Sequence, residues 1–249
     1  MSLLRRIRLI VLSAAVFLVA WKLIVVIGDY PEYILPAPEV VAARAVEAIQ
    51  SGTLQPHLAA TLEESVIGFA VGALVAIGMG ILLAKSLTAE RVLSPYLVAA
   101  QAIPILALAP LLDIWFGGGL TARVVICALI VFFPIAIATM VGIRGTDPLL
   151  VEMVRANGAR AAQVTRLLEL PSALPVIFGG LRVGVTLAVI GAVVAEWAGA
   201  SIGLGVLINI ADQGLFDTPL MFVALGTLAV LGLTFYGVVL AVERAVIPR

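Results

Sequence analysis

The sequence predicts an all-α membrane protein: a polytopic bundle of about six transmembrane helices with a cytoplasmic loop that carries a short helix pair. Hydrophobic residues make up 63% of the 249 residues, charged residues make up 12%, and the mean hydropathy is +1.20. Such a chain has too few polar residues to cover a soluble globule of its size. Apolar stretches of about 20 residues, the length that crosses the hydrocarbon layer, also recur along it. We expect one transmembrane domain over residues 1–249.

The apolar stretches define the candidate membrane spans. They cover residues 7–27, 65–84, 92–112, 122–141, 173–199 and 219–242. At the start of the first span, Arg5, Arg6 and Arg8 precede an apolar run, as the basic residues of a signal peptide would. No small-x-small cleavage pattern with a hydrophilic continuation follows it, because Trp21 and Lys22 lead into another apolar run. We therefore expect this span to be retained.

The basic residues predict the orientation of the spans. With the N-terminus in the cytoplasm, 11 of the 15 lysines and arginines fall in cytoplasmic segments: Arg5, Arg6, Arg8, Lys85, Arg91, Arg144, Arg155, Arg160, Arg166, Arg244 and Arg249. This distribution agrees with the positive-inside rule. Both termini and the polar segment 145–171 are expected on the cytoplasmic side of a cell membrane that the chain crosses several times.

Segment 145–171 is predicted to form two short helices outside the membrane. Asp147 can cap a helix that begins at Pro148, and Asn157-Gly158 supplies a left-handed stop. A second short helix is expected to follow and to end at Pro171. A helix pair of this kind, standing out of a membrane protein, is typical of a docking element for a soluble partner.

Several helices show features of protein–protein packing within the membrane. Gly68 with Gly72, and Gly180 with Gly184, form small-x-x-x-small pairs that let helix backbones approach closely. Prolines inside the third and fourth spans predict kinks, which a translocation pathway would use and which plain irregularity of the bundle would also explain. His57, the one histidine, is expected in a solvated outer loop, and a surface helix is expected over residues 38–50.

The chain has no sequence motif for a chemical reaction. It contains no G-x-x-x-x-G-K-[ST] loop, no cysteine–histidine cluster, no G-x-S-x-G and no H-E-x-x-H. We therefore predict no catalytic residue, no metal and no cofactor in this chain, so any ATP that drives it is bound by another polypeptide. Cys127, the single cysteine, is expected to be a small buried apolar residue.

Part of the polar segment reads Glu152-Met153-Val154-Arg155-Ala156-Asn157-Gly158-Ala159, and Leu170-Pro171 follows. This pattern is similar to the EAA motif in the permease subunits of bacterial ABC importers. Met153 and Val154 stand where the motif has two alanines. Segments over nearly the whole chain resemble the nitrate, sulfonate and taurine branch of that family; these are Ile34-Leu35-Pro36-Ala37-Pro38, Thr61-Leu62, Ile114-Trp115-Phe116-Gly117, Phe132-Phe133-Pro134, Gly180-Leu181-Arg182, Val194-Ala195-Glu196-Trp197 and Phe216-Asp217-Thr218-Pro219.

The resemblance implies a translocation subunit rather than an enzyme. It implies two copies of this chain in the bilayer, a cytoplasmic ABC ATPase dimer, an extracytoplasmic solute-binding protein and no nucleic acid. The helix over residues 149–156 would be the coupling helix. From this resemblance we expect ATPase coupling at Glu152, Arg155, Asn157, Gly158, Ala159 and Arg160, with Asn157 at a position where leucine is common in the family.

Candidate pathway residues are Gln101, Phe132, Phe133, Glu196 and Trp197. The Glu-Trp pair and the C-terminal segment resemble permeases for aromatic heterocycles, such as riboflavin or the pyrimidine precursor of thiamine. Nitrate, taurine and alkanesulfonates remain alternative substrates. Two other functions are less consistent with the sequence. A secondary transporter would need paired ionisable groups within the membrane. A membrane subunit that does not transport would not explain the spans that contain prolines.

Overall fold

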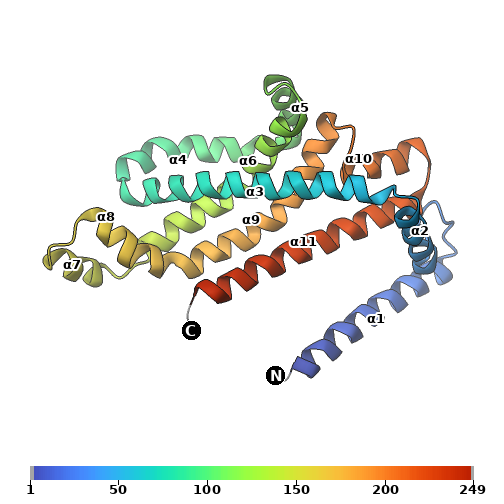
Figure 1. Cartoon of the computed structure of the whole chain (residues 1–249), viewed down its shortest axis with the longest axis horizontal. Coiled ribbons are helices and arrows are strands. Elements are labelled where there is room, and N and C mark those ends of the chain that lie inside the picture. The colour runs from blue at the N-terminus through green and yellow to red at the C-terminus, as the bar shows by residue number, and fades with distance from the viewer. Residues whose placement is uncertain (1–2, 248–249) are drawn as a thin grey trace.

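The computed structural model describes residues 3–247, and the regular structure in that range is helical (Figure 1). In chain order the elements are α1 (Leu3–Gly28), α2 (Pro38–Gln50), α3 (Leu54–Lys85), α4 (Leu87–Ala102), α5 (Ile105–Trp115), α6 (Gly119–Arg144), α7 (Pro148–Ala156), α8 (Ala161–Val164), the π-helical turn η1 (Thr165–Glu169), α9 (Leu170–Gly199), α10 (Leu204–Asn209), the π-helical turn η2 (Ile210–Gly214) and α11 (Thr218–Val246).

The centre of the bundle is formed by α3, α6 and α9, which pack closely because small residues line their contacts. A Cβ atom added at Gly72 of α3 would lie 2.7 Å from the Ala128 carbonyl oxygen of α6. One added at Gly180 of α9 would lie 2.5 Å from the Ala138 Cβ atom, again on α6. Glycine is therefore required at both places, as the small-x-x-x-small pattern predicts.

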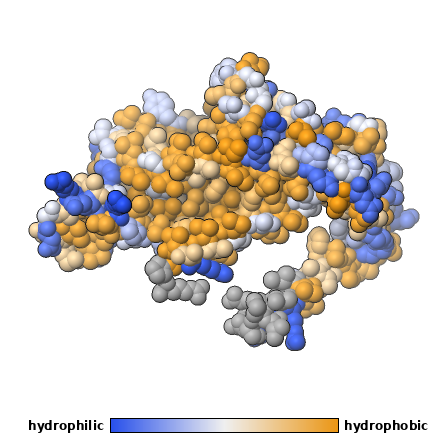
Figure 2. Space-filling model, viewed as in Figure 1, coloured by the Kyte–Doolittle hydropathy of each residue, from blue (hydrophilic) through white to orange (hydrophobic). Residues whose placement is uncertain are grey.

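An apolar surface covers the middle of the long helices, and polar residues gather at the two ends of the bundle (Figure 2). Five described helices are long and apolar enough to cross a membrane, or six spans result if α4 and α5 together form one. This confirms the predicted membrane helix bundle. The span predicted over residues 92–112 is not one helix, since α4 and α5 are bent by 100°. The bend lies at Ile103, which is extended (ψ 122°) because the next residue is Pro104.

The second short helix of the polar segment does not end at Pro171. It continues through α8 and η1 into α9, so that one helical stretch covers Ala161–Gly199. Proline removes one amide donor and its ring collides with the carbonyl four residues earlier. The π-helical turn η1 precedes Pro171 and adapts the helix to it, with the Leu170 amide donating to the Thr165 carbonyl instead. The polar segment is thus joined rigidly to a membrane helix.

The end of the bundle opposite α7 carries α2, α10 and η2 (Figure 1). The surface helix predicted over residues 38–50 is confirmed as α2, whose apolar residues Val41, Ala45 and Ala48 pack with α10 and α11. The helix α1 stands at the periphery: no residue of its Val11–Gly28 window is buried, and Trp21 stacks on Phe222 of α11 with ring centroids 5.6 Å apart.

Candidate functional site

The short helix α7 lies at one extremity of the molecule, and its sequence fixes where it begins and ends (Figure 1). The Asp147 side chain accepts a hydrogen bond from the Leu149 amide over 2.9 Å. At the other end, the Asn157 side-chain amide donates to the Met153 carbonyl over 2.8 Å. Gly158 then adopts a φ of +85°, a conformation that side chains disfavour. The predicted cap and left-handed stop are both confirmed.

The surface of α7 is uncovered. It has no buried residue, and the apolar side chains of Leu149, Leu150 and Met153 are 73%, 42% and 56% exposed. Glu152 and Arg155 lie elsewhere on the helix, where they line a pocket of about 280 Å³ at the end of the bundle. A nine-residue helix with an exposed apolar face gains little stability on its own, so this surface suits a partner protein.

Ion pairs join the ends of the membrane helices beside α7. Lys85 at the end of α3 pairs with Glu169 of η1, which is nearly buried. Thr165 donates a further hydrogen bond of 2.9 Å to the Glu169 carboxylate. Arg144 at the end of α6 binds both carboxylate oxygens of Glu90 on α4, at 2.8 and 2.7 Å. The ends of several membrane helices are therefore joined to one another beside α7.

The remaining residues of the motif form the turn after α7. Ala159 is partly buried, whereas Arg160 is exposed. The Arg160 backbone amide donates to the Gln163 side chain over 2.8 Å, which closes the start of α8. The structure thus brings Glu152, Arg155 and the turn onto one small projecting unit.

Two pathway candidates meet in a groove beside the bend between α4 and α5. Gln101 and Phe133 line this groove, whose volume is about 340 Å³, together with Pro104 and apolar residues of α6. The Phe132 and Phe133 rings pack edge to face at 5.2 Å, but Phe132 faces the core formed by α3, α6 and α9. The structure therefore places Gln101 and Phe133 together at a surface and Phe132 behind them.

Glu196 and Trp197 bind the same peptide segment from two sides. The Gly205 amide donates to Glu196 Oε2 over 2.5 Å, and Trp197 Nε1 donates to the Gly205 carbonyl over 3.0 Å. Glu196 is 2% exposed, whereas Trp197 is 45% exposed and lines an apolar groove between α9 and α11. Both side chains hold the start of α10 against α9.

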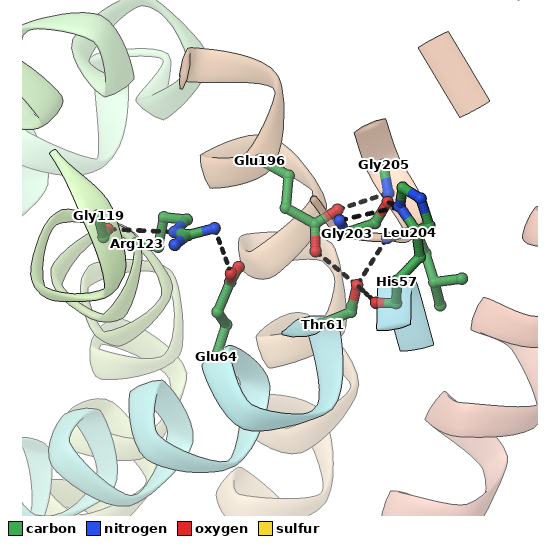
Figure 3. Close-up of polar contacts among 9 residues, drawn as sticks. All are labelled: His57, Thr61, Glu64, Gly119, Arg123, Glu196, Gly203, Leu204 and Gly205. Carbon is green, nitrogen blue, oxygen red and sulfur yellow. Dashed lines mark hydrogen bonds and ion pairs between the residues drawn. The ribbon is translucent and has the colours of Figure 1, made fainter. Parts of the chain in front are cut away.

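A buried hydrogen-bond network surrounds this contact (Figure 3). Thr61 of α3 donates to Glu196 Oε1 over 2.5 Å and accepts from the Leu204 amide over 2.8 Å. His57 Nδ1 lies 2.6 Å from the Gly203 carbonyl and 3.1 Å from the Gly203 amide. The expectation of a solvated loop histidine is wrong, because α3 begins at Leu54 and carries His57 into this network.

Sequence reasoning missed a second buried acid, Glu64, beside this network (Figure 3). Glu64 is 1% exposed, and its Oε1 lies 2.8 Å from the Arg123 guanidinium of α6. The signal was available, since Glu64 lies four residues before Gly68 and eight before Gly72, on the buried side of α3. An acidic residue on the same helix face as glycines that pack against another helix indicates a buried ion pair.

Residues 3–247 contain no group of three or more histidine, cysteine or acidic side chains that could hold a metal ion. Cys127 is fully buried against the Ala188 carbonyl, as expected of a small apolar residue.

Residues 57–248 match the family model of the binding-protein-dependent transport system inner membrane component. The chain belongs to this family. It is a permease subunit of an ABC importer, and its membrane helices serve transport.

Three relatives of the permease come from different bacteria. It is 47% identical to the riboflavin transport system permease protein RibX of Chloroflexus aurantiacus, over 92% of this chain and 85% of that protein. It is 36% identical to the formylaminopyrimidine transport permease protein ThiX of Halalkalibacterium halodurans, over 87% and 86% of the two chains. It is 28% identical to the taurine permease TauC of Escherichia coli, over 98% and 90%.

The fold of the permease also matches solved structures. An inward-facing structure of the methionine ABC transporter MetNI superposes with a TM-score of 0.71 at 22% identity, covering 79% of this chain and 96% of that chain. The similarity supports the arrangement of helices described above.

Proposed function

We propose that this permease imports an aromatic heterocycle, such as riboflavin or a pyrimidine precursor of thiamine, from an extracytoplasmic solute-binding protein. The observation that carries this proposal is the 47% identity to a riboflavin permease over 92% of the chain. Identity falls to 28% for the taurine permease, although that comparison covers 98% of the chain. The chain performs no reaction on the solute, and a separate ATPase hydrolyses ATP.

The coupling element of this importer is α7, seated in a cleft of the ATPase. Its exposed residues Leu149, Leu150 and Met153 supply the apolar contact. Glu152, Arg155 and Arg160 supply the polar contacts around it, and Asn157, Gly158 and Ala159 form the turn that follows α7. Closure of the ATPase dimer then moves α7, and the ion pairs beside it pass the movement to the membrane helices. In this proposal α7 and both termini of the chain lie in the cytoplasm.

Two copies of the chain form the pathway. The groove lined by Gln101 and Phe133 is open at the surface of one copy, and α4 has no buried residue. A second copy facing the first would enclose the grooves and cover α4. Phe132 supports the ring of Phe133, which offers a stacking surface to a planar solute. Glu196 and Trp197 shape the outer end of the pathway by fixing the start of α10.

The substrate is tested on the solute-binding protein of the same transporter. Its thermal unfolding is measured with riboflavin, the thiamine pyrimidine, taurine, alkanesulfonates and nitrate, since a ligand raises the unfolding temperature by binding the folded state. The proposal expects stabilisation by a flavin or a pyrimidine. Stabilisation by sulfonates or nitrate alone would overturn the aromatic substrate and leave the family assignment intact.

A further inference from the structure

Charge is distributed unevenly between the two ends of the permease. Acidic side chains that are exposed or partly exposed gather at the end opposite α7: Asp29, Glu32, Glu39, Glu47, Glu63, Asp113, Asp212 and Asp217. The basic residues described at that end are Lys22, Arg44 and Arg123. The surface of this end is therefore predominantly acidic.

Each of these basic residues already has an acidic partner. Lys22 pairs with Glu39, and this cation holds the pKa of the Glu39 carboxyl below its ordinary value. Arg44 Nε lies 2.8 Å from Asp217 Oδ2, and Arg123 pairs with the buried Glu64. Among the residues that the structure describes, five of the exposed or partly exposed acids at this end have no ion pair; they are Asp29, Glu32, Glu63, Asp113 and Asp212. Their charge is available to a partner.

A groove of about 610 Å³ lies within this acidic end. One wall is the segment that joins α1 to α2, with Glu32 and Tyr33, and the other is the turn before α11, with Leu215 and Phe216. The walls are joined by a hydrogen bond of 2.9 Å from the Thr218 hydroxyl to the Tyr33 carbonyl. The Arg44–Asp217 ion pair joins α2 to the start of α11. The groove is thus held in shape before anything binds.

Aromatic side chains are presented to the outside at this groove. Tyr33 is 70% exposed and Phe216 is 80% exposed. Phe216 has a φ of +51°, and hydrogen bonds fix the residues on either side of it: the Leu215 amide donates to the Ile210 carbonyl and the Asp217 amide to the Ala211 carbonyl. A large exposed ring held in a disfavoured backbone conformation is typical of a contact residue.

We propose that this groove docks the extracytoplasmic solute-binding protein, and that the partner presents a lysine- or arginine-bearing face with an apolar residue for Phe216. The inference rests on the proposed function. Charge complementarity favours a basic protein face over lipid, because Arg44, the cation that lines the groove, is already paired and the unpaired carboxylates repel anionic headgroups. Desolvation of Tyr33 and Phe216 supplies the apolar part of the contact.

Thiol labelling tests whether the groove faces the outside of the membrane and whether the solute-binding protein covers it. Cys127 is fully buried, so a Phe216→Cys variant of the assembled transporter in vesicles offers one accessible thiol among the described residues. We expect a membrane-impermeant maleimide to label it from outside and the solute-binding protein to protect it. Failure to label would place the groove in lipid, and labelling without protection would place the partner elsewhere; either result overturns the inference.

Charge substitution tests the chemistry of the contact. Glu32→Lys should weaken binding of the solute-binding protein at least about tenfold at low salt, with a smaller effect at high salt. Glu32→Gln should give a smaller loss. The control, Gln50→Lys, places a lysine at the end of α2 outside the groove lining; it changes the charge by one unit, as Glu32→Gln does, and should change binding less than about twofold. Equal effects of Glu32→Lys and Gln50→Lys would overturn a specific contact.

The proposed function and the proposed docking surface can be contradicted by different results. Stimulation of ATP hydrolysis by the solute-binding protein in the unaltered transporter tests the proposed function. If stimulation occurs while the Glu32 and Phe216 variants bind normally, only the docking surface is wrong. If no stimulation occurs in the unaltered transporter, the proposed function fails first.

Discussion

Thr61 on α3 donates a 2.5 Å hydrogen bond to the Glu196 carboxylate on α9, at a point where both residues are almost completely buried. Thr61 also accepts a hydrogen bond from the Leu204 amide at the start of α10. One hydroxyl therefore joins three elements, and the glutamate is stabilised by donors rather than by a direct cation. This relationship makes the end of the bundle opposite α7 a fixed unit.

Replacing Thr61 by valine should destabilise the permease by about 1–3 kcal/mol, because the carboxylate and the Leu204 amide lose a buried partner. Thr234→Val is the matched control, since the exposed Thr234 hydroxyl bonds only within α11, to the Val230 carbonyl. Thermal unfolding in detergent checks both variants. Equal stability of the two variants would show that the network contributes nothing.

Removing the arginine of the Glu64–Arg123 pair alone should destabilise the permease more than replacing both residues of the pair. Arg123→Met leaves a buried carboxylate without its cation and should cost about 3–5 kcal/mol. The double variant, which adds Glu64→Gln to Arg123→Met, should recover most of the lost stability because it no longer buries a carboxylate charge. The free energy of unfolding of the two single variants and the double variant measures this coupling. Additive losses would contradict a direct pair.

Two glycines of α3 should behave differently when each is replaced by alanine. A Cβ at Gly72 would lie 2.7 Å from the Ala128 carbonyl oxygen, so Gly72→Ala should separate α3 from α6 and cost about 1–3 kcal/mol. A Cβ at Gly78 meets nothing within 4 Å. Gly78→Ala should therefore stabilise the helix by up to about 1 kcal/mol. Unfolding measurements that show the same sign for both variants would contradict the packing described here.

Gly158→Val should uncouple the transporter without unfolding it. The φ of +85° at Gly158 disfavours a β-branched residue, so the turn after α7 would change shape while the membrane helices stay intact. We expect loss of solute uptake with ATP hydrolysis retained. Gly158→Asn, which tolerates this conformation better, should keep most of the uptake. Normal uptake by the valine variant would show that the turn is not needed for coupling.

The parts of the fold that follow from local rules could be predicted from the sequence. Helix α7 was predictable because Asp147, Pro148 and Gly158 each act on the backbone nearby. The bend at Pro104 was not, since a proline marks a break without giving its angle. The continuation through Pro171 depended on a π-helical turn, which no local pattern indicated.

The polar network could be predicted only in part. Glu196 was recognisable as an acid near the end of an apolar run, but its partners come from α3 and from the start of α10, far away in the sequence. The hydropathy pattern assigns His57 to a loop because the apolar window begins after it, whereas α3 starts three residues before His57, at Leu54. Contacts between helices decide which polar residues meet. These contacts depend on how the glycines of α3 and α9 pack against α6, which a hydropathy profile does not show.

The most direct test of the central claim is uptake of labelled riboflavin into proteoliposomes that hold the permease, its ATPase and its solute-binding protein. The account predicts accumulation that requires both ATP and the binding protein and that is abolished by Gly158→Val. Accumulation driven by an ion gradient without ATP would contradict an ATP-coupled importer. ATP-dependent accumulation of taurine or a sulfonate, with none of riboflavin, would contradict the proposed substrate.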